Sequence, residues 1–198
     1  MEGHPLFLNP FNYLCSMQEE DTSIHNYVYS SEMVEFVKAA NAYNIFLEQL
    51  QGDEGRDFII EAVRQLSTVY AGILRTGESE PVLESPGEPR VTEQEWAALF
   101  QRIATILGPY NDILRVADNG EFDRSELVNH TISEDMADVY QELRDFTAIY
   151  SLGVEELMND AAWELNERFN EHWGKKLLRA LQALHELYVS GIDPREKE

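Results

Sequence analysis

The chain has almost no cysteine, few basic residues and no long apolar run, and each shortage excludes a class of protein. Its single cysteine, Cys15, rules out an intrachain disulfide, so we expect a protein of a reducing compartment. Nowhere does an apolar run reach the length of a membrane span. The first residues also lack the basic start and apolar core of a signal peptide. We therefore expect a cytoplasmic protein that does not span a membrane.

Basic residues are far outnumbered: 15 Lys and Arg stand against 37 Asp and Glu, which gives a formal net charge of −22. Such a chain repels phosphate backbones and anionic lipid, so we expect neither a nucleic-acid partner nor a membrane surface. The charge leaves open a solvated acidic surface, a basic protein partner, a divalent metal or mimicry of a nucleic acid. With 43% hydrophobic residues in a chain of 198, one domain can build its core without disulfides or metal.

Beyond residue 30 the apolar residues recur every three or four positions, which is the spacing of amphipathic helices. Helices are predicted over 30–51, 58–73, 92–107 and 133–150. Thr92 precedes Glu95 by the spacing at which a hydroxyl and a carboxylate together cap a helix start. The proline- and glycine-rich run 76–91 predicts a surface loop, and 110–117 predicts either a short helix or an extended segment.

No strand pair and no repeat is recognisable, so we predict an all-α, single-domain bundle of about five to seven helices. The bundle is predicted to span residues 30–190. Residues 1–29 have no helical period and carry two prolines among large apolar residues, which predicts an extended or partly mobile N-terminal arm lying on the bundle. Residues 191–198 form the predicted C-terminal tail.

The last helical region, residues 154–189, changes its apolar face partway along. On an ideal helical wheel the apolar residues from Trp173 onward are rotated by roughly 130° from those up to Leu165. We therefore expect either different neighbours for the two halves or a bend. Gly174 lies at the change. Because an interior glycine costs about 1 kcal/mol relative to alanine, its presence favours a bend or a close helix approach.

A cationic stripe follows the same region, although the chain as a whole is acidic. It comprises Arg168, His172, Lys175, Lys176 and Arg179. We expect these side chains to pair with acidic neighbours inside the bundle. The alternatives are a pocket for a phosphate or carboxylate ligand, and plain solvation.

Two aspartates, Asp135 and Asp138, open the helix predicted from residue 133. Negative charge at a helix N-terminus contributes about 0.3–1 kcal/mol. We hypothesise further that one of these aspartates contacts Arg168 or His172 and orients the imidazole. The candidates for binding an anion or a partner are therefore Arg168, His172, Lys175, Arg179, Asp135 and Asp138.

Two stretches, ISEDMADVYQELRDF at 132–146 and AAWELNERFNEHWGKKLLRALQAL at 161–184, resemble an uncharacterised bacterial family, domain-of-unknown-function family 5063. The matching positions are Ser133, Asp135, Asp138, Tyr140, Leu143, Trp163, Phe169, His172, Trp173, Gly174, Ala180 and Leu181. The resemblance covers most of 30–185 and implies a helical fold without supplying an activity. We expect Trp173, Gly174 and Tyr140 to be structural. Lys175 stands where the family pattern has histidine, which weakens any two-histidine metal site.

Catalytic motifs are scarce. Glu32 with Glu35 and Glu54 with Asp57 fit the Glu-x-x-Glu and Glu-x-x-Asp template of all-helical, metal-dependent pyrophosphatases. Carboxylates three residues apart share a helix face, so two such pairs could hold magnesium, although acidic chains often match this template by chance. The chain has no phosphate-binding glycine loop and no nucleophile elbow, and we predict no cofactor.

We therefore predict a non-enzymatic module that binds another protein, as an adaptor or a regulator. The alternative is a metal-dependent hydrolase of nucleotides or phosphate esters that uses the four carboxylates of the pyrophosphatase template. An enzyme would need those carboxylates to converge in a pocket. A binding module would instead need an exposed patch or groove.

Overall fold

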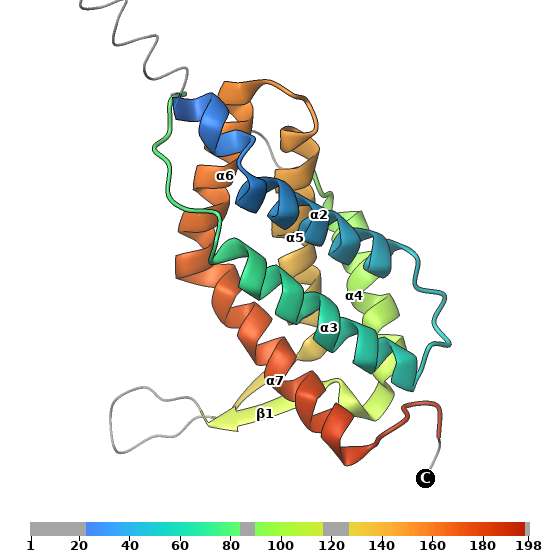
Figure 1. Cartoon of the computed structure of the whole chain (residues 1–198). Coiled ribbons are helices and arrows are strands. Elements are labelled where there is room, and N and C mark those ends of the chain that lie inside the picture. Colours follow the sequence, from blue (N-terminus) through green and yellow to red (C-terminus); the bar gives the residue numbers. More distant parts are fainter. Residues whose placement is uncertain (1–22, 84–89, 117–126, 197–198) are drawn as a thin grey trace, which may run out of the picture.

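The structure, a computed structural model, describes residues 23–83, 90–116 and 127–196 and arranges them as a helical bundle (Figure 1). Its helices are α2 (Ser31–Glu48), α3 (Arg56–Ile73), α4 (Glu93–Leu107), α5 (Ile132–Tyr150), α6 (Glu155–Arg168) and α7 (Gly174–Ser190). The predicted all-α class is confirmed. Among the residues described, no helix is both long enough and apolar enough to cross a membrane.

Helix α5 lies at the centre of the bundle and packs against α2, α4, α6 and α7. Helix α7 also packs along α3, and α3 along α2, so a single core links them. The predicted apolar stripes supply this core, with Phe36, Leu66, Met136 and Leu177 all essentially inaccessible to solvent. Burying one side chain of this size stabilises a fold by about 1.5–3 kcal/mol.

Side-chain caps fix where three of the helices begin. The Ser30 hydroxyl accepts the Met33 amide at 3.2 Å at the start of α2. Thr92 and Glu95 form the predicted capping box of α4. Thr131 caps α5 through its hydroxyl. Because each cap satisfies amides that the first turn leaves free, these helix starts are set by a few neighbouring residues.

The prediction that the chain has no strand pair is wrong. Strands β1 (Asp112–Val116) and β2 (Leu127–Thr131) form an antiparallel pair that projects from the bundle and packs against the start of α5 (Figure 1). Each strand is only five residues long, and its hydrogen bonds come from a partner more than ten positions away. Periodicity within so short a segment does not distinguish a strand from an irregular segment.

Most of the predicted N-terminal arm lies outside the described residues. Its last part is described, and residues 23–28 are helical rather than extended. The Val28 carbonyl accepts a hydrogen bond from the Tyr150 hydroxyl, which fixes this end to α5. At the other terminus Gly191, with φ of 72°, ends α7. Arg56 then donates to the Ile192 carbonyl at 3.4 Å, so the tail returns to the start of α3.

A π-helical turn, η2 (Phe169–Trp173), joins α6 to α7 in one continuous helical path. A π turn holds about one residue more than an α turn, and one extra residue rotates all later side chains by about 100°. This rotation explains the change of face predicted from the sequence, since Leu165 and Leu177 both enter the core. A Cβ on Gly174 would lie 2.6 Å from the Phe169 carbonyl oxygen. Glycine therefore permits the expected close approach.

Candidate functional site

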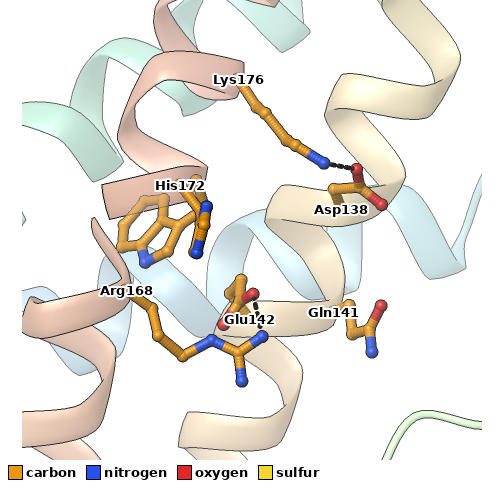
Figure 2. Close-up of a pocket in the computed structure, with 7 residues that line it drawn as sticks. Asp138, Gln141, Glu142, Arg168, His172 and Lys176 are labelled. Atoms are coloured by element: carbon orange, nitrogen blue, oxygen red, sulfur yellow. Dashed lines mark hydrogen bonds and ion pairs between the residues drawn. The ribbon is translucent and has the colours of Figure 1, made fainter. Parts of the chain in front are cut away.

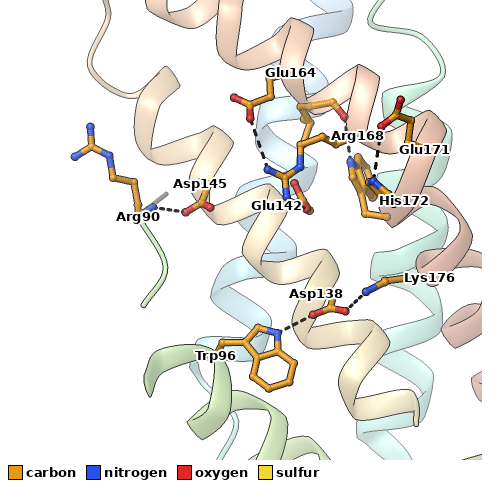
Figure 3. A network of polar contacts seen from close by, with 12 residues as sticks. Arg90, Trp96, Asp138, Glu142, Asp145, Glu164, Arg168, Glu171, His172 and Lys176 are labelled. Carbon is orange, nitrogen blue, oxygen red and sulfur yellow. Dashed lines mark hydrogen bonds and ion pairs between the residues drawn. The ribbon is translucent and has the colours of Figure 1, made fainter. Parts of the chain in front are cut away.

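Several of the polar side chains singled out by the sequence meet where α5 faces the end of α6, η2 and α7. Figure 3 shows Asp138, Arg168 and Lys176 in this region. Helix α5 contributes acidic residues at positions 135, 138 and 142, whose spacing puts them on one helical face. The facing path contributes Arg168, Lys176 and Arg179. The predicted pairing of the cationic stripe with acidic neighbours in the bundle is therefore correct for these three cations.

The innermost pair joins Arg179 to Asp135. The Arg179 Nε lies 2.8 Å from Asp135 Oδ2, and its Nη2 contacts the other carboxylate oxygen. The Asp135 side chain is only 2% exposed. Hydrogen bonding to Asp135 raises the pKa of Arg179, and the charge of Asp135 adds to the burial that already raises the pKa of Tyr43. A two-pronged ion pair this deep in the bundle has a structural role.

The middle pair joins Lys176 to Asp138, and the same carboxylate holds a third helix. Asp138 Oδ1 accepts the Trp96 indole N–H at 2.8 Å, while Oδ2 contacts the Lys176 ammonium. Asp138 on α5 thereby links α4 and α7 (Figure 3). Hydrogen bonds to a charged acceptor are about twice as strong as neutral ones, which favours a fixed position for this carboxylate.

The outer pair joins Arg168 to Glu142. Arg168 Nη2 lies 2.7 Å from Glu142 Oε1, and Nη1 lies 3.6 Å from Glu164. Burial raises the pKa of Glu142, and the facing Arg168 charge opposes that rise. The cost of burying the charged form of Glu142 is therefore only partly offset by its attraction to Arg168.

A cavity of about 230 Å³ opens between the outer and middle pairs (Figure 2). Its wall on α5 is acidic, and its wall formed by the end of α6, η2 and the start of α7 is largely basic. The lining residues are Asp138, Gln141, Glu142, Arg168, His172, Trp173 and Lys176. Because each cation in the wall has a carboxylate partner, the cavity carries charges of both signs and has no surplus for an anion alone.

Two further candidates, His172 and Lys175, remain at the surface. The His172 side chain is 67% exposed, and its Nε2 lies 3.7 Å from the neighbouring Glu171 carboxylate. Lys175 is exposed, and within the part of the chain that the structure describes it forms no ion pair. Among the described residues, neither side chain forms a hydrogen bond with a hydroxyl or thiol.

The hypothesis that Asp135 or Asp138 contacts Arg168 or His172 is wrong. The structure pairs Asp135 with Arg179 and Asp138 with Lys176. The π turn is the physical reason, because it rotates α7 relative to α6 and brings Lys176 and Arg179 opposite the start of α5. Arg168 meets α5 one turn further on, at Glu142. The wheel that assumed one straight α-helix could not place these partners.

The residues expected to be structural occupy three different environments. The Trp173 ring is buried, and its Nε1 donates to the Leu165 carbonyl at 3.0 Å. Gly174 allows the π turn. Tyr140 lines a separate cavity of about 400 Å³ beside Arg102 and Arg144. Burial, together with its hydrogen bond to Glu48, raises the pKa of Tyr140 to about 12.

The alternative metal site does not form. Glu35 pairs with Lys38 at 2.6 Å, and Glu54 accepts the Gly52 amide at 3.0 Å in the turn before α3. Over the described ranges, which include Glu32 and Asp57, no group of three or more acidic, histidine or cysteine side chains could hold a metal ion. Both pairs of carboxylates have the i,i+3 spacing of the template, but a metal site also requires the two pairs to face each other. Glu54 instead accepts hydrogen bonds from backbone amides of its own turn.

Sequence reasoning missed Gln141 and Glu142 in the cavity wall. Glu142 lies four residues after Asp138, on the same helical face, and that spacing was a usable signal. It also missed two carboxylates that hold loops. Asp145 accepts the Val91 amide at 2.8 Å, and Asp160 accepts the Leu83 amide at 2.8 Å. No local pattern marks these contacts, because the acceptor and the loop are far apart in the chain.

Comparison with known proteins places this fold in a family. The sequence model of the family described as Domain of unknown function (DUF5063) matches residues 27–190, so the chain belongs to that family. The resemblance inferred from residues 132–184 is confirmed.

A solved relative carries the same architecture. The crystal structure of protein BF1032 from Bacteroides fragilis superposes with a TM-score of 0.70 at 28% sequence identity, covering 81% of this chain and 94% of that one. No curated protein matches the chain. The family match and the similarity to this solved structure support the helical fold and indicate no activity.

Proposed function

We propose that this member of domain-of-unknown-function family 5063 is a non-enzymatic module that binds another protein, as an adaptor or a regulator. The observation that supports it is the cavity between α5 and α7, with an acidic wall and a basic wall that includes the exposed His172. Lys175, three residues further along the same helical path, is also exposed, and these two side chains are here called the rim. We assign the docking surface to this cavity and to the adjoining side chains of His172 and Lys175.

The chemistry of the cavity favours a protein over a small anion or a nucleic acid. Its cations are already paired with carboxylates, so a phosphate would have to compete with Glu142 and Asp138. A protein segment can present an acidic group to the basic rim and a basic group to the α5 wall at once, which gives specificity through complementary charge. The net charge of −22 opposes approach of a nucleic acid and favours a partner that is basic overall.

The runner-up, a metal-dependent hydrolase of nucleotides or phosphate esters, receives no support from a specific observation. Its carboxylates are separated: Glu32 and Glu35 on α2 contact Ser31 and Lys38. Glu54 accepts an amide in the following turn, and Asp57 lies in the first turn of α3. The cavity contains only two carboxylates, and each faces a cation.

Charge reversal at the rim tests the proposal. Lys175→Glu combined with His172→Glu changes two exposed positions, so the fold should be retained, as a thermal melt will verify. Lys38→Glu is the matched control, since Lys38 is equally exposed but lies on α2, where it pairs only with its neighbour Glu35. Proteins captured from the source cell by the wild type and by the control should be lost with the double variant.

Binding of a captured protein must then be measured directly with purified components. The purified candidate should bind the wild type and Lys38→Glu with the same Kd in a calorimeter, and should bind the double variant at least tenfold more weakly. Equal affinity for all three chains would contradict the docking surface. If no protein depends on the rim in capture, the binding-module proposal itself fails.

A further inference from the structure

A second surface is covered by the chain itself. Residues 77–83, here called the strap, have no helix or strand structure and run along α6 from the end of α3 toward the helix at 23–28 (Figure 1). The strap shares no residue with the cavity between α5 and α7. It lies against α6 as a short peptide would.

Helix α6 holds the strap through backbone atoms. The two carboxylate oxygens of Asp160 accept the Val82 amide at 2.9 Å and the Leu83 amide at 2.8 Å. The neighbouring Asn159 donates from Nδ2 to the Glu80 carbonyl at 2.8 Å. A carbonyl and two successive amides are thus recognised over four residues. Because these groups are common to every chain apart from proline amides, another peptide could satisfy the same three hydrogen bonds.

The strap itself fits this surface incompletely. Its two apolar side chains, Val82 and Leu83, remain 48% and 41% exposed, so little apolar area holds them in place. Where the strap meets the bundle, the hydroxyls of Tyr27 and of the strap residue Ser79 and the Asn166 amide nitrogen are buried without a hydrogen-bond partner among the described residues. Ser79 and Asn166 lie beside the Tyr27 hydroxyl and lower its pKa, against the larger opposing effect of burial, yet none of these groups is aligned for a hydrogen bond.

Cavities flank the strap. One, of about 610 Å³, is lined by strap residues together with Ile24, Tyr27 and Asn159. Another, of about 420 Å³, has an apolar wall that includes Ile73, Trp163 and Phe169. Leu83 lines neither cavity and Val82 lines only the first, so both cavities leave room for larger apolar side chains on a segment following the same path.

We propose that the α6 surface under the strap is a docking groove for an extended segment of another protein, and that the strap occupies this groove in cis until the segment displaces it. The backbone is recognised by Asn159 and Asp160, and large apolar side chains fill the flanking cavities. Departure of the strap removes Glu78 and Glu80 and leaves Asp160 and Glu167 at the groove, so the preferred segment has basic rather than acidic flanks.

The test releases the strap without altering α6. Val82→Pro combined with Leu83→Pro in the full chain removes both N–H groups that Asp160 accepts. The probe is a fluorescent peptide, Gly-Lys-Ser-Lys-Pro-Phe-Phe-Lys, which follows the sequence of residues 77–84 with each glutamate changed to lysine and with Val82 and Leu83 changed to phenylalanine. The released chain should bind this peptide at least tenfold more tightly than the wild type does.

Two controls make the outcome specific. Adding Asp160→Ala to the released chain should weaken peptide binding at least tenfold. Adding Glu171→Ala, an exposed carboxylate on η2, should leave it unchanged. Equal binding by the wild type and the released chain, or binding that does not depend on Asp160, overturns the proposal.

A second measurement serves if the released chain does not fold. In the wild type, saturating peptide should displace the strap and speed hydrogen exchange of the Val82 and Leu83 amides at least tenfold, while amides in the core of α5 remain protected. Unchanged exchange at both strap amides with the peptide present would overturn the proposal. This test is independent of the rim variants, so the two docking surfaces can fail separately.

Discussion

At the scale of single residues, burial decides what each ion pair between α5 and the last helical path does. Asp135 and Arg179 are largely hidden, so this pair fixes the packing of two helices and is inaccessible to a ligand. Glu142 and Arg168 meet at the edge of the cavity, where Arg168 remains partly exposed. The middle pair, Asp138 and Lys176, also lines the cavity and is partly exposed, so the innermost pair differs from the other two in being closed to a ligand.

Glu142 should make stability depend on pH in a defined direction. Its pKa is raised in the folded protein above the ordinary value of 4.5, so the folded state holds this proton more tightly than the unfolded state. The associated stability is fully present below pH 4.5 and is lost as the pH rises through the raised pKa. Glu142→Gln cannot ionise, so its stability should fall less than that of the wild type over the same rise in pH.

Urea unfolding at a series of pH values measures this difference. Glu164→Gln is the matched control, because Glu164 also faces Arg168 but lies on α6 and is more exposed. This control shows what the loss of a carboxylate facing Arg168 costs at a position more exposed than that of Glu142. If the pH profile of Glu142→Gln were parallel to that of the wild type, the burial of Glu142 would not contribute to the pH dependence of the free energy of unfolding.

Trp173 should be one of the costliest side chains to remove. Trp173→Ala deletes the largest fully buried side chain and leaves the Leu165 carbonyl without the indole N–H, so we expect a loss of about 3–5 kcal/mol in the free energy of unfolding. Trp173→Phe keeps most of the packing and should cost less. Denaturant unfolding gives both values. A loss under about 1 kcal/mol for Trp173→Ala would show that the ring is not a core anchor.

At the scale of elements, the π turn η2 determines which residues of α7 face α5. Without its extra residue, Lys176 and Arg179 would rotate away from Asp138 and Asp135 by about 100°. The Gly174 amide stabilises the turn by donating a hydrogen bond to the Phe169 carbonyl. The Phe169 and Trp173 rings also pack edge to face, with their centroids 4.7 Å apart. It therefore links core packing to the geometry of the candidate site.

Gly174→Ala tests this dependence. Alanine is the better helix former by about 1 kcal/mol, yet its Cβ would meet the Phe169 carbonyl oxygen at 2.6 Å and the Phe169 ring at 2.9 Å. The turn must then shift, and we expect a net loss of about 1–3 kcal/mol in the free energy of unfolding. Lys175→Ala at the adjacent exposed position should cost less than about 0.5 kcal/mol. A Gly174→Ala chain as stable as the wild type would mean that the close approach is not needed.

At the scale of the whole molecule, many carboxylates of this acidic chain accept hydrogen bonds or form ion pairs that stabilise the fold. Asp145 and Asp160 accept amides of the segment between α3 and α4, Glu95 caps α4, and Glu54 caps the turn before α3. Others neutralise the cations of the last helical path. Some of the acidic side chains are therefore needed as hydrogen-bond acceptors within the fold. Their large number does not by itself imply a metal site.

Metal binding should accordingly be weak. Titration of metal-stripped protein with Mn²⁺ at physiological ionic strength should give only small, unsaturating heats, because the carboxylates of the pyrophosphatase template are not gathered in one place. Calorimetry gives the answer directly. Saturable binding at one or two sites that Glu35→Gln abolishes would instead support the hydrolase and remove the grounds for a purely binding role.

Much of the architecture could be predicted because it depends on neighbouring residues. The stripe containing Phe36 and Tyr43 and the capping box of Thr92 and Glu95 are local patterns, and each produced the helix expected of it. For the candidate site, the sequence identified charged residues that could take part but did not show how they pair in space. Which carboxylate meets which cation depends on the angle between helices, and a single π turn was enough to move every pairing.

The sequence by itself determined the helical class, the helix starts, the buried stripes and the family, since hydrophobic periodicity and capping act within a few residues of chain. Only the tertiary structure decided the β-hairpin, the cavity with its two walls and the strap held by Asp160, because each joins groups that are distant in sequence. Contacts of that kind depend on how whole helices pack, and no local pattern contains that information.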